Sequence, residues 1–167
     1  MECKLTESEV GTCSRPRITE KDPIYKREYC DGRYARQLNR KERCSLTELK
    51  IEYWKYIPIL FNWTSDIDLD PCPLRDTYQL VRNVLAACVS PDKEVGSESG
   101  HAVLLYDERN PAFQSGGKGR REWDTVRKAL KNPALLQQCT WQQVMGVMRR
   151  DSELSWLTEL LQIKYGF

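Results

Sequence analysis

The stretch Met1-Glu2-Cys3-Lys4-Leu5-Thr6 opens the chain and predicts a buried β-strand. Side chains alternate between the two faces of a strand, so Glu2 and Lys4 share one face and Cys3 takes the other. The acid and the lysine then stand about 7 Å apart. A carboxylate can hold Mg²⁺ and a lysine can orient or deprotonate water, which suits metal-assisted phosphodiester hydrolysis. Because a catalytic strand is rarely the first element of a protein, we expect this chain to be the C-terminal part of a larger fold.

The composition is that of one polar domain. Its 167 residues are enough to build a single core. The 26 basic residues nearly balance the 24 acidic ones, so any nucleic-acid binding must come from local patches rather than the net field. No apolar run approaches the roughly 20 residues that span a bilayer, and the first residues carry no signal-peptide core. We therefore expect no membrane partner.

The seven cysteines are scattered, odd in number and free of any C-x-x-C pair. This pattern favours reduced thiols over a disulfide framework, and so a cytoplasmic location. The chain has one histidine, His101, and no paired cysteines, so a structural zinc site is not expected.

Residues 7–72 read as a long insert between the first strand and the next clear element. Residues 7–45 are polar, with charges of both signs and interleaved tyrosines. Basic residues beside tyrosines suit a phosphate backbone, and a solvated face with packing tyrosines explains the pattern equally well. Ser45-Leu46-Thr47-Glu48 has the capping-box pattern, which predicts a short helix or turn to about Tyr56, before Pro58.

The second half of the chain shows clearer periodicity. An apolar stripe predicts a buried helix over residues 73–89, and a continuous apolar run predicts a buried strand over 101–106. Residues 115–121 read as a flexible basic loop without P-loop spacing, either a phosphate contact or plain surface. The remainder reads as helical, with Thr140 as a cap and a last helix over 152–163. The expected apolar face of that helix consists of Leu154, Leu157, Leu160 and Leu161.

In this order the elements resemble the second half of the PD-(D/E)XK nuclease fold, which includes restriction endonucleases. Glu2-Cys3-Lys4 corresponds to its E-x-K strand, and Tyr78-Gln79-Leu80-Val81-Arg82-Asn83 is similar to the Tyr-Gln-Leu-x-Arg-Asn helix of a bacterial restriction-endonuclease-like group. The 101–106 strand, the Asn110-Pro111 turn and the later helices resemble the tail of that group. The implied fold is α/β (α+β): a partial restriction-endonuclease-like mixed sheet with flanking helices and a helix-rich C-terminal part.

The resemblance implies one nuclease-like domain over residues 1–167, N-terminally incomplete, with the long insert at about 7–72. The strand that carries the metal-binding aspartate of the family would precede Met1. A second E-x-K, Glu48-Leu49-Lys50, falls in the expected capping-box helix, where residues two apart do not share a face.

The function implied by the resemblance is Mg²⁺-dependent DNA endonuclease activity in bacterial defence. Glu2 would ligate Mg²⁺, Lys4 would position the attacking water, and the helix would orient the site or contact the scissile phosphate. Many nucleases of this fold dimerise to cut both strands, so the resemblance allows a homodimer. The residues assigned are Glu2, Lys4, Gln79 and Arg82 for catalysis, and Lys118, Arg120 and Arg121 for substrate binding.

The absence of the upstream acid from this chain leaves a second interpretation open. The chain would then be a non-catalytic nucleic-acid-binding or protein-interaction module, including an inactive remnant of a nuclease. The basic, tyrosine-bearing 15–43 segment and the basic loop motivate this alternative. Phosphate binding of this kind should weaken steeply with salt.

Overall fold

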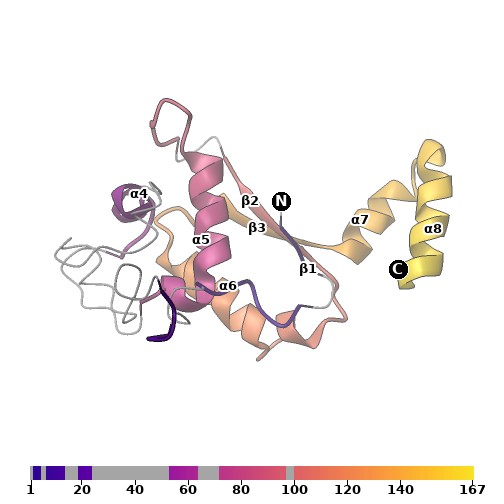
Figure 1. The fold of residues 1–167 in the computed structure, drawn as a ribbon. Coiled ribbons are helices and arrows are strands. Elements are labelled where there is room, and N and C mark those ends of the chain that lie inside the picture. The colour runs from indigo at the N-terminus through magenta and orange to yellow at the C-terminus, as the bar shows by residue number, and fades with distance from the viewer. Residues whose placement is uncertain (1, 5–6, 14–18, 24–52, 64–71, 97–99) are drawn as a thin grey trace.

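A small parallel sheet lies at the centre of the computed structural model (Figure 1). The structure describes residues 2–4, 7–13, 19–23, 53–63, 72–96 and 100–167, and the side chains of 2–4 and 53–54 are outside this description. The strand order is β1-β2-β3, and both pairings are parallel. The strands are β1 Glu2–Lys4, β2 Ala102–Tyr106 and β3 Leu136–Thr140.

Helices make up most of the remaining described chain, so the predicted α/β class is confirmed. The resemblance implied a mixed sheet, whereas the three described strands run parallel. The α-helices are α4 Tyr53–Leu60, α5 Leu74–Cys88, α6 Lys118–Ala129, α7 Trp141–Met148 and α8 Ser155–Tyr165. Short 3₁₀ turns are η2 Pro111–Phe113, η3 Pro133–Leu135 and η4 Ser152–Leu154.

The helical layer follows from the sheet topology. Parallel neighbours cannot be joined by a hairpin, so the chain must cross over the sheet between strands. Two right-handed crossovers that step in the same direction place their helices on the same face. In agreement, α5 packs against β2 and against α6. Between these elements lie the fully buried side chains of Leu80, Val84, Leu104 and Val126.

The two strongest predictions from periodicity are confirmed. The 73–89 helix is α5, and the 101–106 strand is β2. The predicted helix cap at Thr140 is also confirmed, because its hydroxyl accepts the Gln143 N–H at 3.1 Å. The Gln143 side chain in turn accepts the Thr140 N–H at 2.8 Å, which completes a capping box.

Residues 136–140 are a correction to the sequence analysis, which read the rest of the chain as helical and expected no strand here. They form β3, paired along its whole length with β2. The stretch Leu-Gln-Gln-Cys-Thr lacks both the alternation of a half-buried strand and a continuous apolar run. The strand structure of residues 136–140 is therefore determined by pairing with β2 and not by the local sequence pattern.

The predicted helix end before Pro58 is also wrong, because α4 continues through this proline. Proline lacks an N–H, so it forgoes one hydrogen bond to the carbonyl four residues earlier. Burial of the neighbouring Ile57 and Leu60 offsets that loss. The capping-box residues 45–48 lie outside the described part of the chain.

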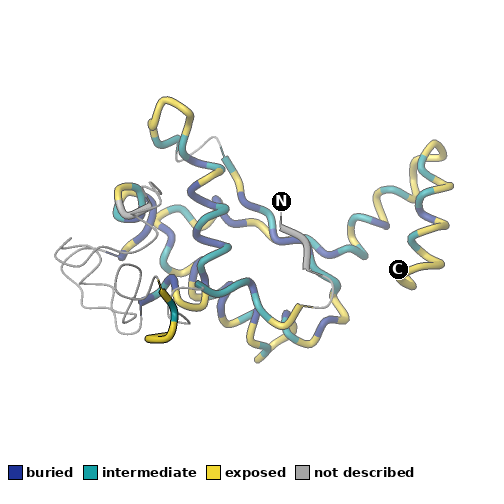
Figure 2. The backbone as a smooth tube through the Cα atoms, in the orientation of Figure 1, coloured by how far each residue is buried: buried dark blue, intermediate teal, exposed yellow. Residues whose placement is uncertain are grey.

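Helices α7 and α8 stand apart from the α4–α6 body, and much of α8 is exposed (Figures 1 and 2). The side of α8 toward α7 carries the buried Thr158 and the half-buried Leu157 and Leu161. Leu160 was expected on this apolar face, but its side chain is 56% exposed. Part of the solvent-exposed face of α8 is therefore apolar.

Two general expectations can be compared with the described residues. None of their helices is both long and apolar enough to cross a membrane. The four cysteines whose side chains are described, Cys13, Cys72, Cys88 and Cys139, are free thiols.

Substitution of Gly119 should destabilise the fold. A Cβ there would lie 2.5 Å from the Phe113 ring, so Gly119→Ala overpacks the junction of α6 and η2. We expect a loss of about 1–3 kcal/mol in the free energy of unfolding, measured by urea denaturation. Gly146→Ala in α7 is the control, because its Cβ would meet no atom within 4 Å. That variant should be neutral or slightly stabilised, and equal losses in both variants would contradict the packing argument.

Candidate functional site

The strand β1, which carries the E-x-K sequence, forms part of the sheet. Glu2 is in register with Leu104 and Lys4 with Tyr106, so both candidate positions lie beside the buried strand β2. Leu104 belongs to the core, and the Tyr106 ring packs at 5.3 Å from Phe113. The predicted strand is therefore confirmed as a strand, with its two candidate residues beside the core of the sheet.

The segment that follows β1, residues 7–13, is fastened to the helical layer and to the loop after β2. The Asn110 amide donates to the Glu7 carbonyl at 2.9 Å. The Cys13 N–H donates to the Arg75 carbonyl, at the start of α5, at 2.8 Å. Between these two ties Val10 is fully buried. These contacts fix the path of the chain as it leaves the candidate strand.

Gln79 of α5 meets this segment at Gly11. The backbone of Gly11 has φ +101°, a conformation that favours glycine, and a Cβ there would lie 2.1 Å from the Gln79 side-chain oxygen. The Gln79 N–H also approaches the Gly11 carbonyl at 3.4 Å. The structure thus brings Gln79 to Gly11, seven residues beyond the end of β1.

Arg82, the second candidate on α5, makes its contacts within its own helix. Its guanidinium lies 6.0 Å from the centre of the Tyr78 ring and donates to the Asn83 side chain at 3.4 Å. Arg82 is half-buried. These contacts hold the cation on the surface of α5 and do not themselves bring it to β1.

The three basic candidates are not in a flexible loop, which corrects the prediction for 115–121. Lys118, Arg120 and Arg121 form the first turn of α6. Lys118 pairs with Glu9 in the 7–13 segment, and Arg120 pairs with Asp124 at 3.3 Å. Arg121 donates to the Gly116 carbonyl. The glycine-rich sequence suggested a loop, but Gly119 is needed for the close contact with Phe113.

Glu122 is a buried carboxylate that the sequence analysis missed. It is 6% exposed, and one oxygen accepts the Val10 N–H at 2.9 Å. The other oxygen has no hydrogen-bond partner among the described residues and lies 3.7 Å from the Lys118 ammonium. Burial raises the pKa of Glu122, although Lys118 and the Val10 N–H oppose the shift. Its place between Gly119 and Val126 on the buried stripe of α6 is the signal that could have revealed it.

The donors for Mg²⁺ are few. Among the described residues, no three acidic, histidine or cysteine side chains are placed to share a metal ion. Magnesium in nuclease-type sites often takes one or two carboxylates, with water and substrate phosphate filling the other positions. Glu2 would supply the one carboxylate that such a site needs at least. The structure describes its backbone and not its side chain.

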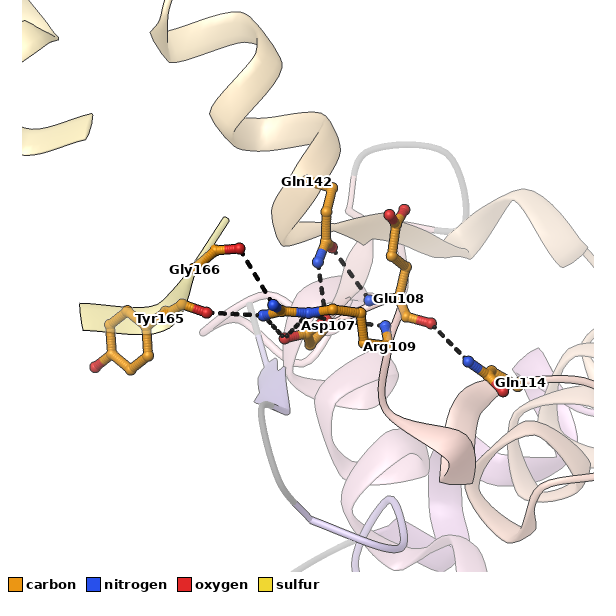
Figure 3. Close-up of polar contacts among 7 residues, drawn as sticks. All are labelled: Asp107, Glu108, Arg109, Gln114, Gln142, Tyr165 and Gly166. Carbon is orange, nitrogen blue, oxygen red and sulfur yellow. Dashed lines mark hydrogen bonds and ion pairs between the residues drawn. The ribbon is translucent and has the colours of Figure 1, made fainter. Parts of the chain in front are cut away.

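A second polar cluster lies at the carboxyl edge of the sheet, directly after β2 (Figure 3). Asp107 and Arg109 form a short ion pair of 2.6 Å, and Gln142 of α7 donates to Asp107 at 2.8 Å. Arg109 also donates to the carbonyls of Tyr165 at 2.9 Å and Gly166 at 3.2 Å. This cluster connects the edge of the sheet to both C-terminal helices.

The charges of this cluster stabilise each other. Hydrogen bonds from Arg109 hold the pKa of Asp107 far below its usual range, and the same contact raises the pKa of Arg109. Both carboxylate oxygens of Asp107 are occupied by Arg109, and one also by Gln142. Asp107 therefore holds Arg109 and Gln142 in place, and its oxygens are already engaged in these hydrogen bonds.

Comparison with protein families gives a match over almost the whole chain. The family model described as "Restriction Endonuclease associating with ARP" matches residues 1–166 of the chain. No curated protein and no solved structure matches the chain.

The buried Glu122 predicts an unusual pH dependence of stability. Because the pKa of this carboxyl is raised on folding, its contribution is favourable below the ordinary value of 4.5 and is lost as pH rises through the raised value. Glu122→Gln should abolish that loss and still accept the Val10 N–H. The stability difference, variant minus wild type, should therefore grow from about pH 4 to about pH 7 in urea denaturation.

A second variant isolates the hydrogen bond to the 7–13 segment. Glu122→Leu has similar bulk but leaves the buried Val10 N–H without an acceptor. It should be about 1–3 kcal/mol less stable than Glu122→Gln. Equal stabilities of the two variants, or a difference from wild type that does not change with pH, would contradict this account of the carboxylate.

Arg109→Ala should loosen α8 selectively. The variant loses both bonds to the C-terminal carbonyls, so hydrogen exchange of the α8 amides should accelerate while that of α5 stays unchanged. Arg120→Ala is the control, because it removes an arginine whose ion pair lies within α6. Similar exchange of α8 in both variants would show that Arg109 does not anchor the helix.

Proposed function

Because the chain belongs to the family of restriction endonucleases associating with ARP, we propose that it takes part in Mg²⁺-dependent hydrolysis of phosphodiester bonds in DNA. The family supports a nuclease-related role. The proposed setting is a restriction or defence system in the cytoplasm, where reduced cysteines would persist.

One observation carries the proposal: the E-x-K sequence lies on a strand of the sheet, next to the buried strand β2. A catalytic pair needs a rigid support, because small displacements of reacting groups cost much of the rate. Here the strand is paired on one side, and the chain beyond it is tied to α5 and α6. Gln79, the third candidate residue, contacts Gly11 in the 7–13 segment that follows this strand.

The proposed roles follow from the chemistry of each side chain. Glu2 would hold the Mg²⁺ ion, and Lys4 would orient the water that attacks phosphorus. Gln79 would orient the groups around that water through its amide, and Arg82 would contact a phosphate oxygen. When bound, the ion would neutralise charge on the phosphoryl oxygens and activate water.

Contact with DNA would involve the first turn of α6. Lys118 and Arg120 already face carboxylates, so phosphate binding would have to compete with Glu9 and Asp124. Arg121 donates a hydrogen bond to the carbonyl of Gly116, which is neutral, so this contact does not neutralise the positive charge of Arg121. We therefore assign the larger share of phosphate binding to Arg121.

The alternative is a protein-interaction module without catalysis. It is favoured by the pairing of two basic candidates with acids and by exposed apolar side chains on α8. The name of the family also refers to an association, with ARP. In this case the E-x-K strand would have only a structural role, as one strand of the sheet.

Plasmid cleavage separates the two proposals. The purified chain should nick supercoiled DNA in Mg²⁺ and should lose this activity in EDTA. Lys4→Ala should lower the rate by about two to four orders of magnitude, because it removes the group that positions or deprotonates water. Arg127→Ala removes an exposed cation from the last turn of α6, to which no role is assigned, and should cleave within a small factor of wild type.

The controls must show that each variant is folded. Circular dichroism and urea denaturation of Lys4→Ala should match the wild-type protein. No cleavage by the folded wild-type chain, or cleavage that survives both EDTA and Lys4→Ala, would reject the catalytic proposal. The first of these outcomes would favour the interaction module.

A further inference from the structure

One side of α8 displays large apolar side chains to solvent. Trp156 is 60% exposed, Leu160 56% and Ile163 82%. Their spacing of four and then three residues places them in one line along the helix, which we call the α8 seam. Thr158 lies on the opposite side of the helix and is buried. The α8 seam therefore faces away from the side on which the helix is packed.

Charged residues flank the α8 seam on both sides. Glu159 lies along one side, and Lys164 along the other. Both residues are exposed, and the Lys164 ammonium lies 5.1 Å from the centre of the neighbouring Tyr165 ring. An apolar line between an acidic and a basic flank is the pattern of a short coiled-coil surface.

We propose that the α8 seam binds a second copy of this chain, with the two α8 helices parallel about a two-fold axis. In this arrangement Trp156, Leu160 and Ile163 each face the same residue of the other copy. The structure thereby assigns an interaction surface and an orientation to a homodimer.

The charges of the flanks select this orientation. In a parallel pair, opposite flanks of the two helices meet, so Glu159 of one copy lies beside Lys164 of the other. The two-fold axis generates this ion pair twice. In an antiparallel pair the same flanks meet, which brings Glu159 toward Glu159 and Lys164 toward Lys164. The parallel arrangement is therefore electrostatically complementary, and the antiparallel one is not.

A hollow lies beside the seam, on the side of Glu159. Its volume is about 420 Å³, and it opens along the Glu159 flank between α8 and the end of α7. It is lined by Arg149, Thr158, Glu159, Gln162 and Ile163. Arg149 is itself bonded to Gln162 and to the Phe167 carbonyl, so it is held within its own chain.

The dimer should be weak. Three seam residues per copy offer less than the roughly 800 Å² per partner of a standard interface. We expect association at micromolar to near-millimolar concentrations, with a population that rises with concentration. The inference rests on the surface of α8 and does not require the chain to be a nuclease.

Sedimentation velocity over this concentration range tests the proposal. The wild-type chain should shift from monomer toward dimer, and Trp156→Ser and Ile163→Ser should remain monomeric. Val147→Ser is the matched control, because this α7 side chain is 67% exposed and lies outside the seam. It should dimerise like the wild-type protein. All of these positions are exposed, and circular dichroism would verify that each variant is folded.

Charge reversal tests the orientation. Glu159→Lys or Lys164→Glu alone should each weaken the dimer by roughly threefold to tenfold, and the double variant should recover most of the wild-type affinity. A wild-type chain that stays monomeric throughout, a dimer unaffected by the seam variants, or no recovery in the double variant would overturn the proposal. Monomers that bind a different protein through α8 would likewise overturn it in favour of that partner.

Discussion

Parallel pairing of β1 with β2 is the constraint on which the rest of the structure depends. A parallel pair cannot be closed by a tight turn, so the long connection between Lys4 and Ala102 has to cross the sheet. The second pairing, of β2 with β3, repeats the requirement and places α6 beside α5. The core then forms between β2 and these two helices, and the candidate strand lies at one side of that core.

The segment that follows β1 is held both by hydrogen bonds and by one buried apolar side chain, that of Val10. Val10 fills the core, yet its N–H needs an acceptor once it is buried. Glu122 supplies that acceptor at the cost of burying a carboxylate, which Lys118 offsets only in part at 3.7 Å. The chain that leaves the candidate strand is therefore positioned by hydrogen bonds as well as by apolar packing.

Local patterns predicted α5 and β2, because the apolar stripe of one and the continuous apolar run of the other require burial wherever they lie. The third strand was beyond such reasoning, since Leu136–Thr140 becomes a strand only through its pairing with β2. The family resemblance singled out Gln79 but could not place it, because its contact with Gly11 joins distant segments. The burial of Glu122 and the pairing of Lys118 depend in the same way on how the 7–13 segment crosses α6.

The C-terminal helices depend on anchoring from outside themselves. A helix as short as α8 is marginal alone, and its last carbonyls lack partners within the helix. Arg109 donates to two carbonyls at its end, and a cation at that end also complements the helix dipole. Because Arg109 is paired with Asp107 immediately after β2, the same contact joins α8 to the carboxyl edge of the sheet. Any partner bound along α8 would thus be oriented relative to the strand that pairs with β1.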